Sequence, residues 1–269
     1  MPELPEVETV KETLKKYVKG KTIKSVDIYY DNIVEYPSVD EFKNKIKNQT
    51  IQDILRRGKW LLFKLDDYYL LSHLRMEGRY YIKHNEEVSK HEHVIFNFDD
   101  FNLRYIDTRK FGRMYLLPIK DAFNMKPLDE LGLEPWDNEL TSEYLKDKYK
   151  NKKLPIKTVL LDQSIITGIG NIYDDEILFM SSINPYKKAS ELNNEDLNNI
   201  IKNTRIVLEK AIKLGGTTIK SYESSEGVHG RFQNELLIHG KDVCPKCGRK
   251  VLKVRINGRG TYYCGECQK

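Results

Sequence analysis

The sequence lacks any apolar stretch long enough to cross a bilayer. Among its 269 residues, no uninterrupted apolar run approaches the roughly 18 to 20 residues that a membrane helix needs. The first residues, MPELPEVET, have neither the basic region nor the apolar region of a secretory signal peptide. We therefore expect a soluble, unsecreted, cytoplasmic protein that has no membrane partner.

Internal repeats and low-complexity tracts are also absent, which excludes a solenoid or a repetitive linker protein. Apolar residues make up 39% of the chain and aromatic residues 10%, enough to build a sizeable core. Intrinsic disorder of the whole chain is therefore excluded. At roughly 150 residues per domain, the length predicts two domains.

The excess of positive charge is small, and it is confined to one end of the chain. Lys and Arg number 45 against 40 Asp and Glu, a formal charge of +5. Residues 240–269 hold eight basic and two acidic side chains, a net charge of +6, and the other 239 residues carry a net charge of −1. A basic cluster of this kind favours a polyanion partner, although a solvated charged tail is the alternative.

Cysteine is scarce, and all four cysteines lie in this basic tail. Cys244, Cys247, Cys264 and Cys267 form two C-x2-C pairs separated by sixteen residues, which is the spacing of a four-cysteine zinc site. Between the pairs, alternating strand patterns flank Asn257-Gly258, which predicts a type I′ hairpin turn. We expect one structural Zn²⁺ in a zinc ribbon. Two disulfides, or a zinc site that does not contact nucleic acid, are the alternatives.

The first half of the chain predicts one helix followed by strands. Apolar residues recur at helical spacing from Leu4 to Val18, with Gly20 at the end. From Lys21 to Leu117 short runs rich in β-branched and aromatic residues predict an antiparallel β-sandwich, with turns at Asp66-Asp67 and Asp99-Asp100. The strands are expected at 22–30, 60–65, 68–74, 79–82, 94–98, 103–106 and 114–117.

Helical patterns dominate the second half. A segment with two prolines and a glycine, Lys126 to Asp137, predicts a linker. Helices are expected at 141–148, 156–161, 172–180 and 195–214, the last ended by Gly215-Gly216. Asn171 is placed to cap the third of these helices, in a glycine-bearing turn whose N–H groups suit a phosphate.

The N-terminus offers a nucleophile. Proline as second residue permits removal of Met1, which leaves the secondary amine of Pro2 as the chain start. An α-amino group has a reference pKa of about 7.7 to 8.0, so a useful fraction is neutral near pH 7 and can attack an electrophilic carbon. The alternative is that Pro2, Glu3 and Glu6 merely start a helix.

Six segments together resemble the bacterial formamidopyrimidine-DNA glycosylase family, which also contains endonuclease VIII. They are MPELPEVETV, RRGKWLLF, SHLRMEGR, DTRKFGRM, TGIGNIYDDEILF and NGRGTYYCGECQ, in order from residue 2 to 268. The resemblance implies an α+β fold, in which an N-terminal helix and antiparallel β-sandwich precede a helical helix-two-turn-helix domain with a C-terminal β-hairpin zinc ribbon. It implies domains at 1–125, 139–232 and 233–269, with a linker at 126–138.

The same resemblance implies the chemistry of a bifunctional glycosylase and lyase. Pro2 is its nucleophile, Glu3 its proton donor and acceptor, Lys59 its phosphate-contacting catalytic lysine and Glu6 a supporting carboxylate. Arg259 binds the phosphates that flank the lesion and assists δ-elimination. The enzyme is expected to act as a monomer in base excision repair, on duplex DNA that contains oxidised purines or abasic sites, associated with the bacterial nucleoid.

Five further residues are DNA contacts by resemblance. Met76, Arg109 and Phe111 fill the space left by a flipped nucleotide, and His73 and Asn171 contact phosphates. Residues 217–231 correspond to a lesion-recognition loop. Asp174 departs from the family pattern, because a carboxylate there would oppose a phosphate unless it points away. Two alternatives remain: an endonuclease VIII-like enzyme for oxidised pyrimidines, and a non-catalytic zinc protein that binds lesions.

Overall fold

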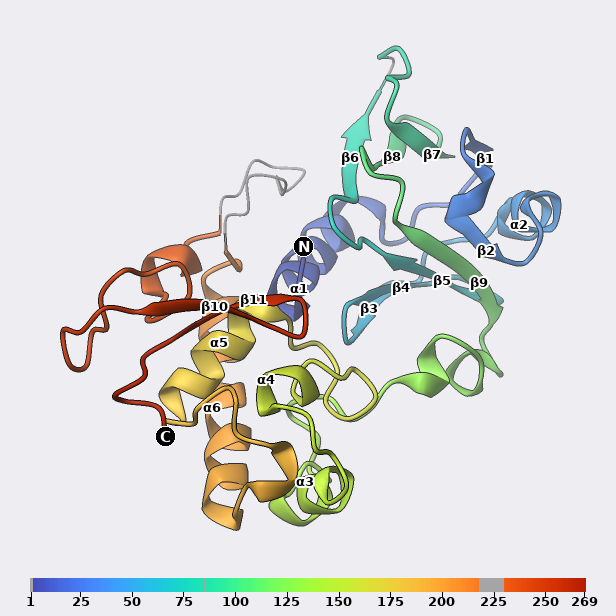
Figure 1. Cartoon of the computed structure of the whole chain (residues 1–269). Coiled ribbons are helices and arrows are strands. Elements are labelled where there is room, and N and C mark those ends of the chain that lie inside the picture. The colour runs from blue at the N-terminus through green and yellow to red at the C-terminus, as the bar shows by residue number, and fades with distance from the viewer. Residues whose placement is uncertain (1, 85, 218–229) are drawn as a thin grey trace. The chain divides into compact units, whose positions relative to one another are not determined.

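The computed structural model describes residues 2–84, 86–217 and 230–269, and the chain divides into two compact units. One unit consists of Met1–Asp129 with Thr217–Gly230, and the other of Glu130–Gly216 with Arg231–Lys269. The division after Asp129 falls inside the segment expected to be a linker, residues 126–138. The finer domain bounds stay a prediction. Figure 1 shows the elements of each unit.

The first unit begins with helix α1 (Leu4–Val18), as the apolar spacing predicts. Pro5 lies in its first turn, where its missing N–H costs nothing, and Lys15 and Lys16 lie in the last turn, near the negative end of the helix dipole. Its apolar face is fully buried. A second helix, α2 (Val39–Ile46), was not expected from the sequence, although Ser38 caps it.

Two sheets complete this unit. One has the strand order β1-β7-β8-β6 and the other β2-β9-β5-β4-β3. The strand bounds are β1 (Ser25–Ile28), β2 (Val34–Tyr36), β3 (Asp53–Arg57), β4 (Trp60–Lys64), β5 (Tyr68–His73), β6 (Arg79–Lys83), β7 (Glu92–Asn97), β8 (Asn102–Ile106) and β9 (Arg113–Pro118). Short 3-10 turns lie at Asp31–Ile33, Ala122–Asn124 and Leu128–Glu130. Residues of α1, α2 and both sheets form one apolar core.

The strand prediction is confirmed with three differences. Strands β2 and β3 were not expected, because β2 has three residues and β3 is rich in charge. The sheet is not wholly antiparallel, since β2 pairs in parallel with β9. Hairpins form at Asp66-Asp67 and at Asp99-Asp100, as predicted.

The second unit is helical, with a two-stranded ribbon. Its helices are α3 (Ser142–Tyr149), α4 (Ile156–Val159), α5 (Asn171–Met180) and α6 (Asn194–Lys213), with 3-10 turns at Ala189–Glu191 and Phe232–Glu235. Helix α5 packs against α6 and against the ribbon (Figure 1). In the part of the chain that the structure describes, no helix is both long and apolar enough to cross a membrane.

The ribbon consists of β10 (Leu252–Ile256) and β11 (Arg259–Tyr263), paired antiparallel with Ile256 opposite Arg259. The turn residues Asn257 and Gly258 have φ values of 45° and 81°. Two successive positive φ values define the I′ turn, so the turn predicted from the sequence is confirmed.

Candidate active site and zinc ribbon

The N-terminal residues are held by one buried carboxylate. Pro2 is buried, and Glu3 and Glu6 are 2% and 0% exposed. Glu6 Oε2 accepts the N–H of Glu3 at 2.9 Å, and Glu6 Oε1 accepts the N–H and the hydroxyl of Thr217 at 2.8 and 3.1 Å. Glu6 therefore fixes the backbone at Glu3 and joins it to a residue 211 positions along the chain. The state of Met1 lies outside the described residues.

Lys59 lies on the two-residue turn that joins β3 to β4. Gly58, the first residue of this turn, has φ 56°, which a type II′ turn requires at that position. Lys59 is only 7% exposed. Arg56 donates to the Gly58 carbonyl at 2.9 Å and to Glu8 of α1 at 2.8 Å. Arg56 thus links the turn that carries Lys59 to helix α1, which begins at the residue after Glu3.

His73 lies beside this turn, because Trp60 pairs with His73 across β4 and β5. Burial lowers the pKa of His73 well below its usual value, and the charges of Arg75 and Lys59 lower it further. Nδ1 accepts the N–H of Arg75 at 3.0 Å, so the neutral ring carries its proton on Nε2. His73 can therefore donate one hydrogen bond without bringing a charge.

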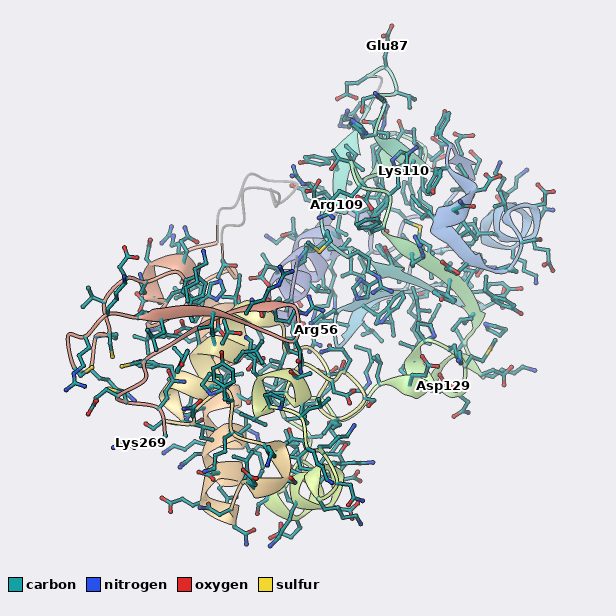
Figure 2. The ribbon with its side chains drawn as sticks, in the orientation of Figure 1. Arg56, Glu87, Arg109, Lys110, Asp129 and Lys269 are labelled. Atoms are coloured by element: carbon teal, nitrogen blue, oxygen red, sulfur yellow. The ribbon has the colours of Figure 1, made fainter. Side chains whose placement is uncertain are left out.

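Met76, Arg109 and Phe111 lie on two connections, after β5 and after β8. Met76 is half-buried, and Phe111 is 45% exposed with the Arg109 guanidinium 4.7 Å from its ring centroid. Figure 2 labels Arg109 and its neighbour Lys110 on the second connection. A hydrogen bond from Thr108 to Glu77 links the two connections. The structure therefore brings together residues that are more than thirty positions apart in the sequence.

Asp107, which the sequence did not single out, shapes the second connection. Its carboxylate is fully buried and accepts the backbone N–H groups of Arg109, Phe111 and Gly112 at 2.8 to 3.0 Å. Lys110 between them has φ 57°. The signal available in the sequence was an Asp that starts a short, glycine-ended loop.

Gly78 and Gly112 make room for a tyrosine between the two connections. A Cβ at Gly78 would lie 2.2 Å from the Tyr105 hydroxyl oxygen, and one at Gly112 would lie 1.8 Å from the same atom. Tyr105 is fully buried, and its hydroxyl donates to Asp107 at 3.4 Å. Only glycine fits at either position without displacing this buried ring.

Asn171 does not cap α5, so that prediction was wrong. The helix starts one residue earlier than expected: Gly170, in an extended conformation, is its N-cap, and Asn171 is already helical. The Asn171 side chain instead donates through Nδ2 to the carbonyl of Gly260 in β11 at 2.9 Å. A side-chain amide has two N–H donors, so one remains available for a ligand.

Asp174 points into the second unit rather than toward a ligand at the start of α5. It is 0% exposed, and its carboxylate lies 3.4 Å from the ammonium of Lys157, which is also buried. Asp175 lies 2.6 Å from the same ammonium. Burial alone would lower the pKa of Lys157, but the two carboxylates raise it. The objection that Asp174 opposes a phosphate is therefore removed.

The four cysteines form one cluster. The sulfur atoms of Cys244, Cys247, Cys264 and Cys267 lie within 4.8 Å of one another, with Cys244–Cys267 at 3.9 Å and Cys247–Cys264 at 3.5 Å. These distances exclude disulfides, whose sulfurs bond at about 2.05 Å. A tetrahedron with Zn–S bonds of about 2.3 Å has sulfurs about 3.8 Å apart. The cluster therefore suits a single structural zinc.

The four close thiols shift one another's protonation. Burial would raise the pKa of Cys264, but backbone N–H groups of Cys267 and Glu266 lower it to about 7. The pKa of Cys267 is raised to about 12, chiefly by its contact with the Cys247 sulfur. Several thiolates this close repel one another, and a divalent cation among them removes that repulsion.

Each unit thus gathers its own set of predicted residues. The first unit contains residues expected at the sugar, at phosphates and in the vacated stack: Pro2, Glu3, Glu6, Lys59, His73, Met76, Arg109 and Phe111. The second unit contains Asn171, Arg259 and the four cysteines. Arg259 is exposed at the start of β11. Of the loop expected at 217–231, residues 218–229 lie outside the described residues.

Comparisons with known proteins match this architecture along the whole chain. Three family models match in order: the formamidopyrimidine-DNA glycosylase N-terminal domain at residues 1–114, the H2TH domain of the same enzyme at 131–223, and the zinc finger found in FPG and IleRS at 241–269. Formamidopyrimidine-DNA glycosylase of Oceanobacillus iheyensis is 48% identical, over all of this chain and 98% of the relative. The chain belongs to the formamidopyrimidine-DNA glycosylase family.

Other relatives agree with this assignment. The Bacillus subtilis formamidopyrimidine-DNA glycosylase is 46% identical over all of this chain and 99% of the relative. Among solved structures, a mutant Lactococcus lactis FPG in complex with a Fapy-dG containing DNA has a TM-score of 0.94 and 37% identity, and each chain is fully covered. The Lactococcus lactis Fpg in complex with an abasic site containing DNA has a TM-score of 0.93. The α+β fold with its H2TH region and zinc ribbon, predicted from the sequence, is confirmed.

Proposed function

We propose that this member of the formamidopyrimidine-DNA glycosylase family removes oxidised purines, 8-oxoguanine and formamidopyrimidines, from duplex DNA and then cleaves the strand as an AP lyase. The observation that carries the proposal is the buried start of the chain, where Glu6 holds Glu3 and Lys59 is attached to the same helix through Arg56. Complexes of a relative with Fapy-dG and abasic DNA support the substrate class.

The reaction begins at the amine of Pro2. Its neutral nitrogen attacks C1′ of the damaged nucleotide, the N–C1′ bond forms, and the bond from C1′ to the base breaks. The departing base carries away the electron pair of that bond and takes up a proton. The nitrogen loses its proton, and its lone pair then breaks the bond between C1′ and the ring oxygen O4′, which takes up a proton as the sugar ring opens. The product is an iminium ion at C1′, which makes the neighbouring 2′ proton acidic. Loss of that proton expels the 3′ phosphate by β-elimination, and δ-elimination then expels the 5′ phosphate.

Glu3 and Lys59 serve this chemistry at the sugar and the phosphate. Glu3 gives a proton during ring opening and takes one during elimination, because its carboxyl lies one residue from the Pro2 amine. Lys59 neutralises a phosphate next to the reacting sugar, and its low exposure strengthens that attraction. Glu6 supports Glu3 by accepting its backbone N–H.

Reaching C1′ requires that the nucleotide leave the base stack, at a cost of roughly a few kcal/mol. We propose that Met76, Arg109 and Phe111 enter the vacated space, because the last two form a stacked pair that is open to solvent. Phosphates are bound by His73 through Nε2–H, by the second amide N–H of Asn171 and by the guanidinium of Arg259.

Zinc contributes structure rather than chemistry. Cys244, Cys247, Cys264 and Cys267 would fill all four positions of a tetrahedral ion, so no position is left for a substrate or a water. Within this proposal the enzyme works as a monomer in the bacterial cytoplasm, on nucleoid DNA.

Borohydride trapping tests the proposal. Protein whose N-terminus is confirmed as Pro2 by mass analysis is mixed with a duplex that contains 8-oxoguanine, and borohydride reduces any iminium to a stable covalent complex. We expect a trapped complex of protein and DNA, and none with protein that retains Met1, which is the matched control. Lesion binding without trapping or cleavage would show a non-catalytic binding protein instead.

A second substrate class has one specific observation in its favour. The wild-type Lactococcus lactis FPG, with a TM-score of 0.92 and 37% identity, is also known in complex with an oxidized pyrimidine containing DNA. Cleavage rates on 8-oxoguanine and thymine glycol duplexes separate the two classes. Faster cleavage of thymine glycol would assign the chain to endonuclease VIII-like activity.

A further inference from the structure

Helix α5 carries two side chains that bind the free edge of the zinc ribbon. Asn171 Nδ2 donates to the carbonyl of Gly260 at 2.9 Å, and Asp175 Oδ2 accepts the N–H of Tyr262 at 3.2 Å. In a two-stranded ribbon, every second residue directs its N–H and C=O away from the partner strand. Gly260 and Tyr262 are such alternate residues of β11, so α5 supplies the partners that a third strand would have given.

The spacing of the two pairs matches. Asn171 and Asp175 are four residues apart, which places them on one face of α5 about 6 Å apart along the axis. Gly260 and Tyr262 are two residues apart, which separates their Cα atoms by about 6.6 Å along the strand. Asn171 donates a hydrogen bond to the strand, and Asp175 accepts one from it. A slide of β11 by one residue would therefore break both bonds at once.

Asp175 is itself held from two sides. Its Oδ1 accepts from the ammonium of Lys157 at 2.6 Å, and its Oδ2 also lies 2.6 Å from Nδ1 of His239. Lys157 further donates to the carbonyl of Asn171 at 3.2 Å. These contacts form a closed network. Asn171 and Asp175 bind β11, and Lys157 binds both of them.

Stability alone does not explain a charged cluster in this position. Lys157 and Asp175 are at most 1% exposed, and desolvating such charges costs about as much as their attraction returns. Apolar side chains of similar volume would fill the same space. They could not distinguish one register of β11 from the next, whereas a donor and an acceptor at fixed spacing do.

The tip of the ribbon is fixed in the same register. Asn257, in the turn, donates to the hydroxyl of Thr158 at 3.0 Å, and Arg259 begins β11 two residues later. We propose that Asp175 is a positioning residue: with Asn171 it sets the register of β11 on α5 and so places Arg259 relative to the phosphate-binding amide of Asn171. This inference rests on the proposed function, in which Asn171 and Arg259 contact phosphates.

The test compares Asp175→Asn with Asp174→Asn. The first change leaves one oxygen and one NH2 group where two oxygens accept from Lys157, His239 and Tyr262. The second removes a charge from the same cluster but leaves both bonds to the ribbon edge in place. Zinc content and thermal unfolding first establish that each variant is folded. Asp175→Glu is the second variant, because it keeps the charge and moves the acceptor by one methylene group.

Affinity and product ratio are then measured on a duplex with an abasic site. For Asp175→Asn and Asp175→Glu we expect DNA affinity to fall between about 2- and 30-fold. We also expect β-elimination product to accumulate at the expense of δ-elimination product, and Asp174→Asn to behave like the unchanged protein. In the background of Arg259→Ala, Asp175→Asn should have little further effect, because residues that act through one contact are not additive.

Three outcomes overturn the inference: an Asp175→Asn protein with unchanged affinity and product ratio, an equal loss in Asp174→Asn, or additive losses in the double variant. Failure of the proposed function is distinguishable, because the unchanged protein would then give neither a borohydride-trapped complex nor strand cleavage.

Discussion

The two units of this protein hold their functional residues by different means. In the first, buried carboxylates collect backbone N–H groups: Glu6 binds those of Glu3 and Thr217, and Asp107 binds three of its own loop. In the second, Glu176 of α5 also accepts three backbone N–H groups, but the ribbon depends in addition on four cysteines and on Asn171 and Asp175 of α5. A large apolar core can position a site by packing and local hydrogen bonds, whereas a segment of about thirty residues, such as 240–269 around the ribbon, needs a metal.

The two units also differ in the burial and charge of their functional residues. The residues proposed for catalysis at the sugar are largely buried and belong to the part of the chain with a net charge of −1, apart from Arg259. Residues 240–269, which include the ribbon, carry the net charge of +6 and expose most of it. Buried groups can have their protonation tuned by their surroundings, and exposed charges attract a polyanion over a distance.

The largest expected effect is the loss of the metal in Cys264→Ser. Three remaining ligands bind zinc weakly, and most of the folding free energy of a small metal site comes from the metal. We expect zinc content to fall well below one ion per chain and DNA binding to be lost, while the first unit stays folded. Elemental analysis, gel-shift titration and circular dichroism measure the three quantities. A zinc-replete variant would contradict the four-cysteine site.

Glu6→Gln tests the buried carboxylate of the first unit. An amide presents one acceptor oxygen and one NH2 group, so the N–H of Glu3 or that of Thr217 loses its partner. We expect the free energy of unfolding to fall by about 1 to 3 kcal/mol, measured by urea denaturation. The yield of borohydride-trapped complex should fall as well, with zinc content unchanged. Full trapping by a destabilised variant would show that Glu6 has a structural role alone.

His73 gives the first unit a pH dependence of its own. Since its pKa is lowered in the folded state, the unfolded chain binds a proton more readily. The stability from neutral His73 is fully present above about pH 6.5, the unfolded value, and is lost as the pH falls toward the folded value.

His73→Gln keeps an acceptor for the N–H of Arg75 but cannot titrate. Urea midpoints at pH 7.5 and 5.5 should therefore differ less in this variant than in the unchanged protein. An equal difference in both proteins would mean that His73 does not contribute to the pH dependence.

The smallest expected effect is that of Arg259→Ala on salt dependence. One phosphate contact contributes about 0.9 to the slope of log affinity against log salt concentration. We expect the slope to shrink by that amount, measured by fluorescence anisotropy. Arg249→Ala is the matched control, because Arg249 is an exposed arginine of the same basic segment, residues 240–269, and pairs with Glu266. Equal changes in both variants would show that only the net charge of the ribbon matters.

Much of the fold follows from patterns that are local in the sequence. Helix α1, the hairpins at Asp66-Asp67 and Asp99-Asp100, and the type I′ turn at Asn257-Gly258 depend on periodicity and turn chemistry within a few residues. Helix α2 and strand β3 were missed because their patterns are short and rich in charge. Their few apolar side chains stabilise a helix or a strand only because the core of the unit buries them.

The candidate site divides in the same way. The four cysteines, the proline after Met1 and the family whose motifs they complete can be recognised without a structure. The folded chain was needed to find that Asp174 is buried against Lys157, that Asn171 binds β11 instead of capping α5, and that Asp107 holds the loop of Arg109. A polar side chain takes its role from its partner, and these partners are set by how the chain packs rather than by the neighbouring sequence.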